Sequence, residues 1–400
     1  MEEEHRGNLK ALVALGVAML TMAMGIGFII PLLPVFSELL GAGGLWVGLI
    51  FGANPATRTL FMPLFGRLAD TRGKKIFLLI GLSGYAVVAV FMSVSTEAWH
   101  LFALRAFHGA LGAMVMPVAR AYVGVLTPKG REGRIMGAFN LSFFMGFALG
   151  PIFGGVVADA LGLRVPFLIM GGLSVISLII VWALVPEQVG DGRGTIRPRP
   201  PFMEIVRQPT ILGLFLGRVF NAMGRGVFIS LLPLYAAGFV LLSQTQIGML
   251  VSTQALLASS IQPGAGWLAD RWNRKHLAAL GFILGPVGLV LLPSADSLIL
   301  LIMIGLLMGL SSGIFVPAST AIAVVEGRQH GMGATMGVVE MAMSIGMASG
   351  SVIGGAVAEV LGLVRAFHVA ALVTLLGLSF FLWFLRDYRE EAIIVDRGQA

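Results

Sequence analysis

Long apolar stretches alternate with short polar segments along almost the whole chain. Each stretch is close to the ~20 residues that a helix needs to cross a hydrocarbon core about 30 Å thick. Because lipid offers the backbone no hydrogen-bond partners, such stretches must form helices. We count twelve of them, at residues 11–36, 45–68, 76–95, 98–126, 134–160, 164–185, 209–236, 245–269, 276–293, 297–325, 333–360 and 364–385. The pattern therefore predicts an all-α membrane protein with twelve transmembrane helices.

The same pattern repeats at a displacement of 200 residues. Gly-Arg-Leu-Ala-Asp at 66–70 returns as Gly-Trp-Leu-Ala-Asp at 266–270, and Asp159 and Glu359 keep the same register. A parallel repeat of this kind is typical of transporters in which two bundles enclose a central site. We expect two pseudo-symmetric six-helix bundles, at residues 1–185 and 209–400, the second ending in a short tail. A cytoplasmic linker at 186–208, rich in Pro, Gly and Arg, joins them.

Composition supports this assignment, since 57% of the residues are hydrophobic and only 12% are charged. Most of the 27 Lys and Arg fall in the termini and in the connections on the same side, whereas Arg164 and Arg365 lie in the opposite connections. Cations accumulate on the cytoplasmic side, so both termini are expected there. We predict a multi-pass protein of a bacterial plasma (inner) membrane. The net charge of +7 follows from this asymmetry and from buried arginines, so no nucleic-acid partner is expected.

A glycine-rich, charged segment follows the second span and returns after the eighth. The first copy, Gly-Arg-Leu-Ala-Asp-Thr-Arg-Gly-Lys-Lys at 66–75, resembles the loop motif of the major facilitator superfamily. In that family the loop acts as a latch that favours the outward-facing state. The resemblance implies latch roles for Gly66, Asp70, Arg72, Gly73 and Lys74, and for Asp270 and Arg271 in the second copy. A carboxylate is stabilised at a helix N-terminus, which agrees with such a role. Asp70 is expected to be the stronger latch and Asp270 the weaker. The alternative is that these are solvated loop charges that only set topology.

The fifth span contains Gly-Phe-Ala-Leu-Gly-Pro-Ile-Phe-Gly-Gly at 146–155, which is similar to the antiporter motif of drug–proton exporters in the superfamily. The resemblance implies that Gly146, Gly150, Pro151, Gly154 and Gly155 govern the conformational equilibrium. Glycines at 146, 150 and 154 share one helix face, so a neighbouring backbone can approach closely. Pro151 adds a bend to the helix. The eleventh span repeats these glycines but has Ser351 in place of the proline.

The fourth span carries Arg105 and His108 in a segment that resembles the family motif with a membrane-embedded arginine implicated in proton transfer. His108 stands where the family usually has Gln. The two residues are three positions apart and so share a helix face. His108 is interpreted either as a titrating partner of Arg105 or as a hydrogen-bonded substitute for the amide.

Charged residues inside the spans are costly, at ~2.5–3.5 kcal/mol each on insertion scales, and are therefore candidates for function. We predict that a polar set lines a water-filled cavity and binds substrate: Asn54, Arg58, Arg105, His108, Arg218, Asn221 and Arg225. Glu340 is the one acid well inside a span, and its repeat partner is Asn140. We hypothesise that Glu340 exchanges the coupling proton, together with Arg105. A fixed ion pair between Glu340 and an arginine is the alternative.

These features favour a proton-coupled exporter of small amphiphilic molecules that works by alternating access. It would use the proton gradient and no cofactor or metal, act as a monomer, and not be an enzyme. Many cation exporters of the family place an acid in the first span, which has none here. The arginine excess therefore keeps open an exporter or flippase of an anionic metabolite or anionic lipid, because guanidinium pairs well with carboxylate and phosphate. A non-transporting receptor or membrane enzyme is the third possibility, although an enzyme would need convergent His, Asp or Glu groups.

Overall fold

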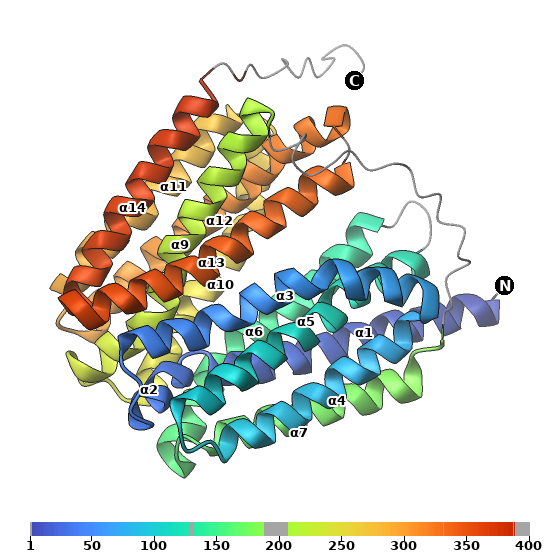
Figure 1. Cartoon of the computed structure of the whole chain (residues 1–400). Coiled ribbons are helices and arrows are strands. Elements are labelled where there is room, and N and C mark those ends of the chain that lie inside the picture. Colours follow the sequence, from blue (N-terminus) through green and yellow to red (C-terminus); the bar gives the residue numbers. More distant parts are fainter. Residues whose placement is uncertain (1, 128–131, 188–206, 331, 387, 389–400) are drawn as a thin grey trace.

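The computed structural model describes residues 2–127, 132–187, 207–330, 332–386 and 388 (Figure 1). Side chains are described for these residues except 2–8, 67, 70, 132–134, 329, 330 and 332–334. Most of the predicted linker, at 188–206, therefore lies outside the described residues. Within the described ranges the chain is helical, with no strand.

The N-terminal half, as we name it, contains the helices α1 to α7. They are α1 (Glu2–Ile29), α2 (Leu32–Leu39), α3 (Gly44–Arg72), α4 (Lys74–Ser93), α5 (Ala98–Leu126), α6 (Glu132–Leu161) and α7 (Val165–Leu184). The first predicted span is divided between α1 and the short α2. The division falls at Pro31, which has no backbone N–H to donate and so cannot continue the hydrogen-bond ladder of α1.

The C-terminal half contains α9 to α14 and repeats the pattern. Its helices are α9 (Pro209–Gly238), α10 (Gln244–Ala269), α11 (Arg274–Leu291), the 3₁₀ turn η1 (Leu292–Ser294), α12 (Leu298–His330), α13 (Met332–Leu361) and α14 (Leu363–Phe384). Gly162 and Gly362, which are repeat equivalents, precede α7 and α14 with φ of 91° and 90°. A side chain is strained in this left-handed region, which explains glycine at both turns.

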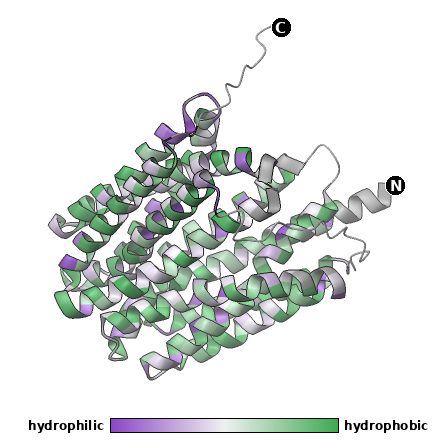
Figure 2. Ribbon diagram, turned by 45° about the horizontal axis from the view of Figure 1, so that its top comes forward, coloured by the Kyte–Doolittle hydropathy of each residue, from purple (hydrophilic) through white to green (hydrophobic). Residues whose placement is uncertain are grey.

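Ten of the described helices are long and apolar enough to cross a membrane by length and composition. The two other long helices, α3 and α10, are more polar. Each of them packs against the opposite half, α3 on α13 and α10 on α6, so it presents less surface to lipid. Apolar residues run along most of the helices in Figure 2. Together these twelve helices confirm the predicted all-α membrane fold.

Packing within each half follows one scheme. In the N-terminal half α1 packs on α6 and α7, and α5 packs on α3 and α4. In the C-terminal half α9 packs on α13 and α14, and α12 packs on α10 and α11. The halves meet through two helix pairs that are equivalent under the repeat, α3 with α13 and α10 with α6. The repeat therefore extends to the interface between the halves.

The halves touch closely at one end, which we call the closed end. There the α2–α3 turn and the start of α10 meet the last turns of α13 and α6. A Cβ atom at Gly48 would lie 2.2 Å from the Ser351 carbonyl oxygen, and one at Gly248 would lie 2.2 Å from the Pro151 carbonyl oxygen. Toward the other end, where α1 begins and α14 ends, the ribbons of the two halves diverge (Figure 1). We call this the open end.

Candidate substrate and proton sites

A polar cluster lies inside the N-terminal half, where α3, α4 and α5 meet. Close contact of α3 and α5 positions it, since a Cβ atom at Gly109 would lie 2.2 Å from the Asn54 carbonyl oxygen. The Thr57 hydroxyl also donates to the Ala106 carbonyl oxygen across these helices at 2.7 Å. The side chains of Asn54 and His108 are thereby brought together.

His108 is the centre of this cluster and is 1% exposed. Its Nδ1 lies 3.1 Å from Arg105 Nη1 and 3.3 Å from Asn54 Nδ2. Because guanidinium nitrogens only donate hydrogen bonds, Nδ1 must accept, and the ring is then neutral with its proton on Nε2. Nε2 has no hydrogen-bond partner in the described part of the chain.

Arginines and a tyrosine complete the cluster. Arg105 is 7% exposed and lies 6.0 Å from the centroid of the Phe51 ring. Arg58 is half-buried and interacts electrostatically with Arg105 and with Tyr85. The Tyr85 ring packs edge-on against His108, with centroids 4.2 Å apart. Sequence reasoning missed Tyr85, although a hydroxyl-bearing aromatic in the middle of an apolar span was a usable signal.

The C-terminal half holds a second polar group on α9. Arg218, only 5% exposed, donates from Nη2 to the Val316 carbonyl oxygen at 3.1 Å and to Thr320 Oγ1 at 2.5 Å. Asn221 is buried and Arg225 is half-buried. Thr320 was not among the predicted site residues, because a threonine in a span commonly bonds its own helix, as this one also does to Val316.

Four arginines share an unusual property. The Nε atom of each is buried and has no hydrogen-bond partner among the described residues; they are Arg58, Arg105, Arg218 and Arg225. A buried donor without an acceptor is costly, so such groups call for an explanation such as a ligand or water.

Glu340 is exposed on α13. It lies before Ala348 and Ser351, whose backbone carbonyl oxygens are close to Gly52 and Gly48 of α3 near the closed end. Glu340 therefore lies on the stretch of α13 nearer the open end. Glu340 also interacts electrostatically with Arg218, although no hydrogen bond joins the two in the described structure.

The glycine-rich segment of α6 lies between α1 and α10. Cβ atoms at Gly146, Gly150 and Gly154 would lie 2.2, 2.5 and 2.3 Å from carbonyl oxygens of α1. Gly155 faces the other way, and a Cβ atom there would lie 2.3 Å from the Gln244 carbonyl oxygen of α10. In the same turn, next to Pro151, the Ile152 backbone N–H donates to the Ser252 hydroxyl of α10 at 3.2 Å. This helix is thus fitted to α1 within its half and to α10 across the interface.

The residues of the two latch copies lie at the open end. Arg72 is exposed and Lys74 is buried, while a Cβ atom at Gly66 would meet nothing within 4 Å and Gly73 has φ of 98°. In the second copy Asp270 is exposed, and the exposed Arg271 stacks 3.8 Å from the centroid of the Trp267 ring. The Asp70 side chain lies outside the described residues.

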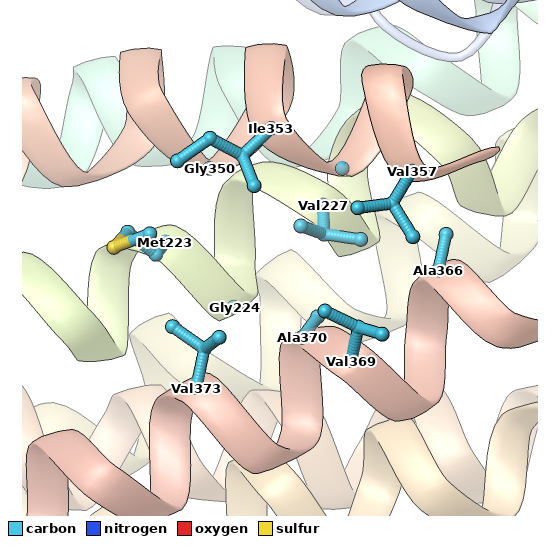
Figure 3. Close-up of a pocket in the computed structure, with 11 residues that line it drawn as sticks. Met223, Gly224, Val227, Gly350, Ile353, Val357, Ala366, Val369, Ala370 and Val373 are labelled. Atoms are coloured by element: carbon cyan, nitrogen blue, oxygen red, sulfur yellow. The ribbon is translucent and has the colours of Figure 1, made fainter. Parts of the chain in front are cut away.

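A separate, small apolar pocket lies within the C-terminal half, between α9, α13 and α14 (Figure 3). Its lining includes Met223, Val227, Ile353, Val369 and Val373. None of the predicted polar site residues lines it.

The predicted polar site residues form two groups. Asn54, Arg58, Arg105 and His108 lie together in the N-terminal half, and Arg218 lies with Glu340 in the C-terminal half. No hydrogen bond links these two groups in the described chain.

A duplicated fold of twelve long helices with buried arginines is typical of membrane transporters. Residues 15–235 and 214–399 each match the family described as the Major Facilitator Superfamily. These matches span nearly the whole chain, so the protein belongs to that superfamily. Membership confirms the predicted class, a transporter rather than an enzyme.

Relatives share this fold over most of their length. The chain is 27% identical over 368 residues to the multidrug resistance protein MdtG of Yersinia enterocolitica, covering 90% of this chain and 89% of the relative. It is 28% identical over 371 residues to an uncharacterized MFS-type transporter of Methanocaldococcus jannaschii, covering 92% and 96%. A solved bacterial homologue of the human lysosomal transporter Spinster, inward-facing and unoccupied, gives a TM-score of 0.80 at 14% identity, covering 95% and 97%. The last likeness shows the fold alone.

Proposed function

We propose that this transporter is a proton-coupled exporter of small amphiphilic molecules that acts as a monomer in a bacterial plasma membrane. The observation that carries the proposal is the α6 segment, whose antiporter-like glycines seat it between α1 and α10. Relatives at this level of identity are named multidrug resistance proteins, which supports a drug-like substrate. With both termini in the cytoplasm, the open end faces inward.

Glu340 is the proposed site of proton exchange. It is exposed on α13, and Arg218 attracts it. A carboxylate in such a place is ionised when it is wet or near the arginine, and it must be neutralised before it crosses a dry intermediate. Binding of a proton and release of Arg218 would then accompany each reorientation.

Uptake by inverted membrane vesicles tests this role. Glu340→Gln removes the titrating group and keeps the shape, so we expect loss of gradient-driven uptake of a fluorescent amphiphile. Exchange of labelled for unlabelled substrate, which needs no gradient, should persist, as should gradient-driven uptake by the control Glu340→Asp. Wild-type uptake by the Glu340→Gln vesicles under a pH gradient would contradict the proposal.

A second candidate, transport of an amphiphile with an anionic group, is favoured by the four unpartnered Nε atoms. A carboxylate or phosphate would satisfy several guanidinium donors at once. Thermal-shift titrations of the purified protein with matched carboxylated, neutral and cationic amphiphiles distinguish the two candidates, because a ligand stabilises the state that it binds. A shift confined to the carboxylated compound would select the second candidate, and shifts with neutral or cationic compounds would select the first.

A further inference from the structure

Two carboxylates cross between the halves at the closed end. Asp159, in the last turn of α6, accepts the backbone N–H of Gln244 through Oδ1 at 3.0 Å and that of Thr245 through Oδ2 at 2.8 Å. Glu359, in the last turn of α13, accepts the backbone N–H of Leu45 through Oε2 at 2.8 Å. Each acid therefore bonds the first turn of a helix that belongs to the opposite half.

The first N–H groups of a helix have no partner within it, and the helix dipole favours a negative charge at that end. In α10 the N-cap Ser243 satisfies the N–H of Gln246, and Asp159 takes the two that precede it. At α3 the N-cap is Gly43, which has no side chain to cap with. A Cβ atom at Gly43 would lie 2.5 Å from Glu359 Oε2, so glycine there leaves room for the carboxylate.

The two contacts are equivalent under the repeat. Asp159 and Glu359 are 200 positions apart, and so are their partners Leu45 and Thr245. The same bond is thus made twice, once in each direction across the interface. A chance surface contact would not be duplicated in this way.

We propose that Asp159 and Glu359 form a paired lock, the closed-end lock, that sets the equilibrium between the two orientations of the transporter. Opening at this end must break both contacts, because α6 and α13 would leave α10 and α3. The lock touches no substrate and acts by positioning the halves. It is independent of which substrate is carried and of whether Glu340 exchanges protons.

Spin-label distance measurements test the lock directly, and the chain has no cysteine to be removed first. One label pair, Val94→Cys with Ile299→Cys, reports on the closed end from exposed sites in opposite halves. A second pair, Ile76→Cys with His276→Cys, reports on the open end, also from exposed sites. Each pair is introduced into the otherwise native chain and into the Asp159→Asn, Glu359→Gln and double variants.

The amides keep the size of the acids but lose the charge, and each replaces one acceptor oxygen by an N–H₂ group. Asp159→Asn can therefore accept only one of the two N–H groups of α10, whereas Glu359→Gln can still accept that of Leu45 and loses the charge alone. We expect about a tenfold gain of the outward-open population in the double variant, from loss of charge at two helix N-termini, with the larger share from Asp159→Asn. The closed-end distance should lengthen while the open-end distance shortens. Asp159→Glu should keep the native distributions, and so should the control Asp296→Asn, which removes another exposed acid at this end.

Unchanged distances at both label pairs in the double variant would overturn the proposal. Broadening of both pairs without opposite shifts would also overturn it, because that is the result expected of general structural damage. Since the readout is a distance in the absence of substrate, it is unaffected by failure of the transport assay for Glu340.

Discussion

His108 shows how one residue can be interpreted only after its partners are known. It stands where the family that this chain resembles usually has Gln, and the sequence left two interpretations open. In the structure Nδ1 accepts from Arg105 and Asn54, a role that a Gln side-chain oxygen can also fill. This arrangement supports the amide-like interpretation.

Substitution of His108 separates these interpretations. His108→Gln retains an acceptor for Arg105, so transport and its pH profile should stay within about threefold of the native protein. His108→Leu leaves the buried guanidinium without that acceptor and should destabilise the protein by about 1–3 kcal/mol. Thermal unfolding in detergent measures the second effect. A pH profile that changes in His108→Gln would instead favour a titrating histidine.

Residues missed by sequence reasoning share a physical reason. Tyr85 and Thr320 act through contacts with other helices, against His108 and Arg218, and neither contact follows from helical spacing. Arg105 and Arg218, by contrast, could be singled out because a charge in an apolar span is costly wherever it points. What the sequence could not provide was the acceptor of each guanidinium, which is His108 Nδ1 for Arg105 and the Val316 carbonyl oxygen for Arg218.

At the level of the elements, α3, α6, α10 and α13 carry the interface. Their bounds follow closely from the apolar pattern, since burial in lipid demands unbroken helices. The interruption at Pro31 was not predicted, because the residues on either side of it are as apolar as a span. The register of Asp159 and Glu359 was visible in the repeat, but their partners are backbone N–H groups, which leave no trace in a sequence.

Gly248 of α10 lies at the interface between the two halves, and its substitution gives a testable prediction. A Cβ atom at Gly248 would lie 2.2 Å from the Pro151 carbonyl oxygen, so Gly248→Ala must push α6 and α10 apart. We expect it to destabilise the closed end by about 1–3 kcal/mol, as overpacking does. Gly264→Ala in the same helix meets nothing within 4 Å and should be neutral or stabilising by about 0.5–1 kcal/mol.

The closed-end spin-label pair and thermal unfolding report on both variants. Gly248→Ala should lengthen the closed-end distance and lower the unfolding midpoint, and Gly264→Ala should do neither. Equal behaviour of the two variants would mean that close backbone packing does not hold the halves together there.

For the whole molecule, the duplicated sequence predicts two bundles but not their relative orientation. Two orientations of such bundles differ by only a few kcal/mol, and a local sequence pattern cannot resolve so small a difference. The structure shows the orientation: the halves contact each other at the closed end and diverge at the end where α1 begins and α14 ends. The solved transporter described as inward-facing has the same fold.

The central claim, exchange of protons for an amphiphile, is tested most directly in proteoliposomes that contain the purified protein and a pH-sensitive dye in an acidic lumen. Adding the amphiphile outside should raise the lumenal pH in step with its accumulation in liposomes containing the native protein, and not in those containing Glu340→Gln. Accumulation of the amphiphile with no change in lumenal pH would contradict the account.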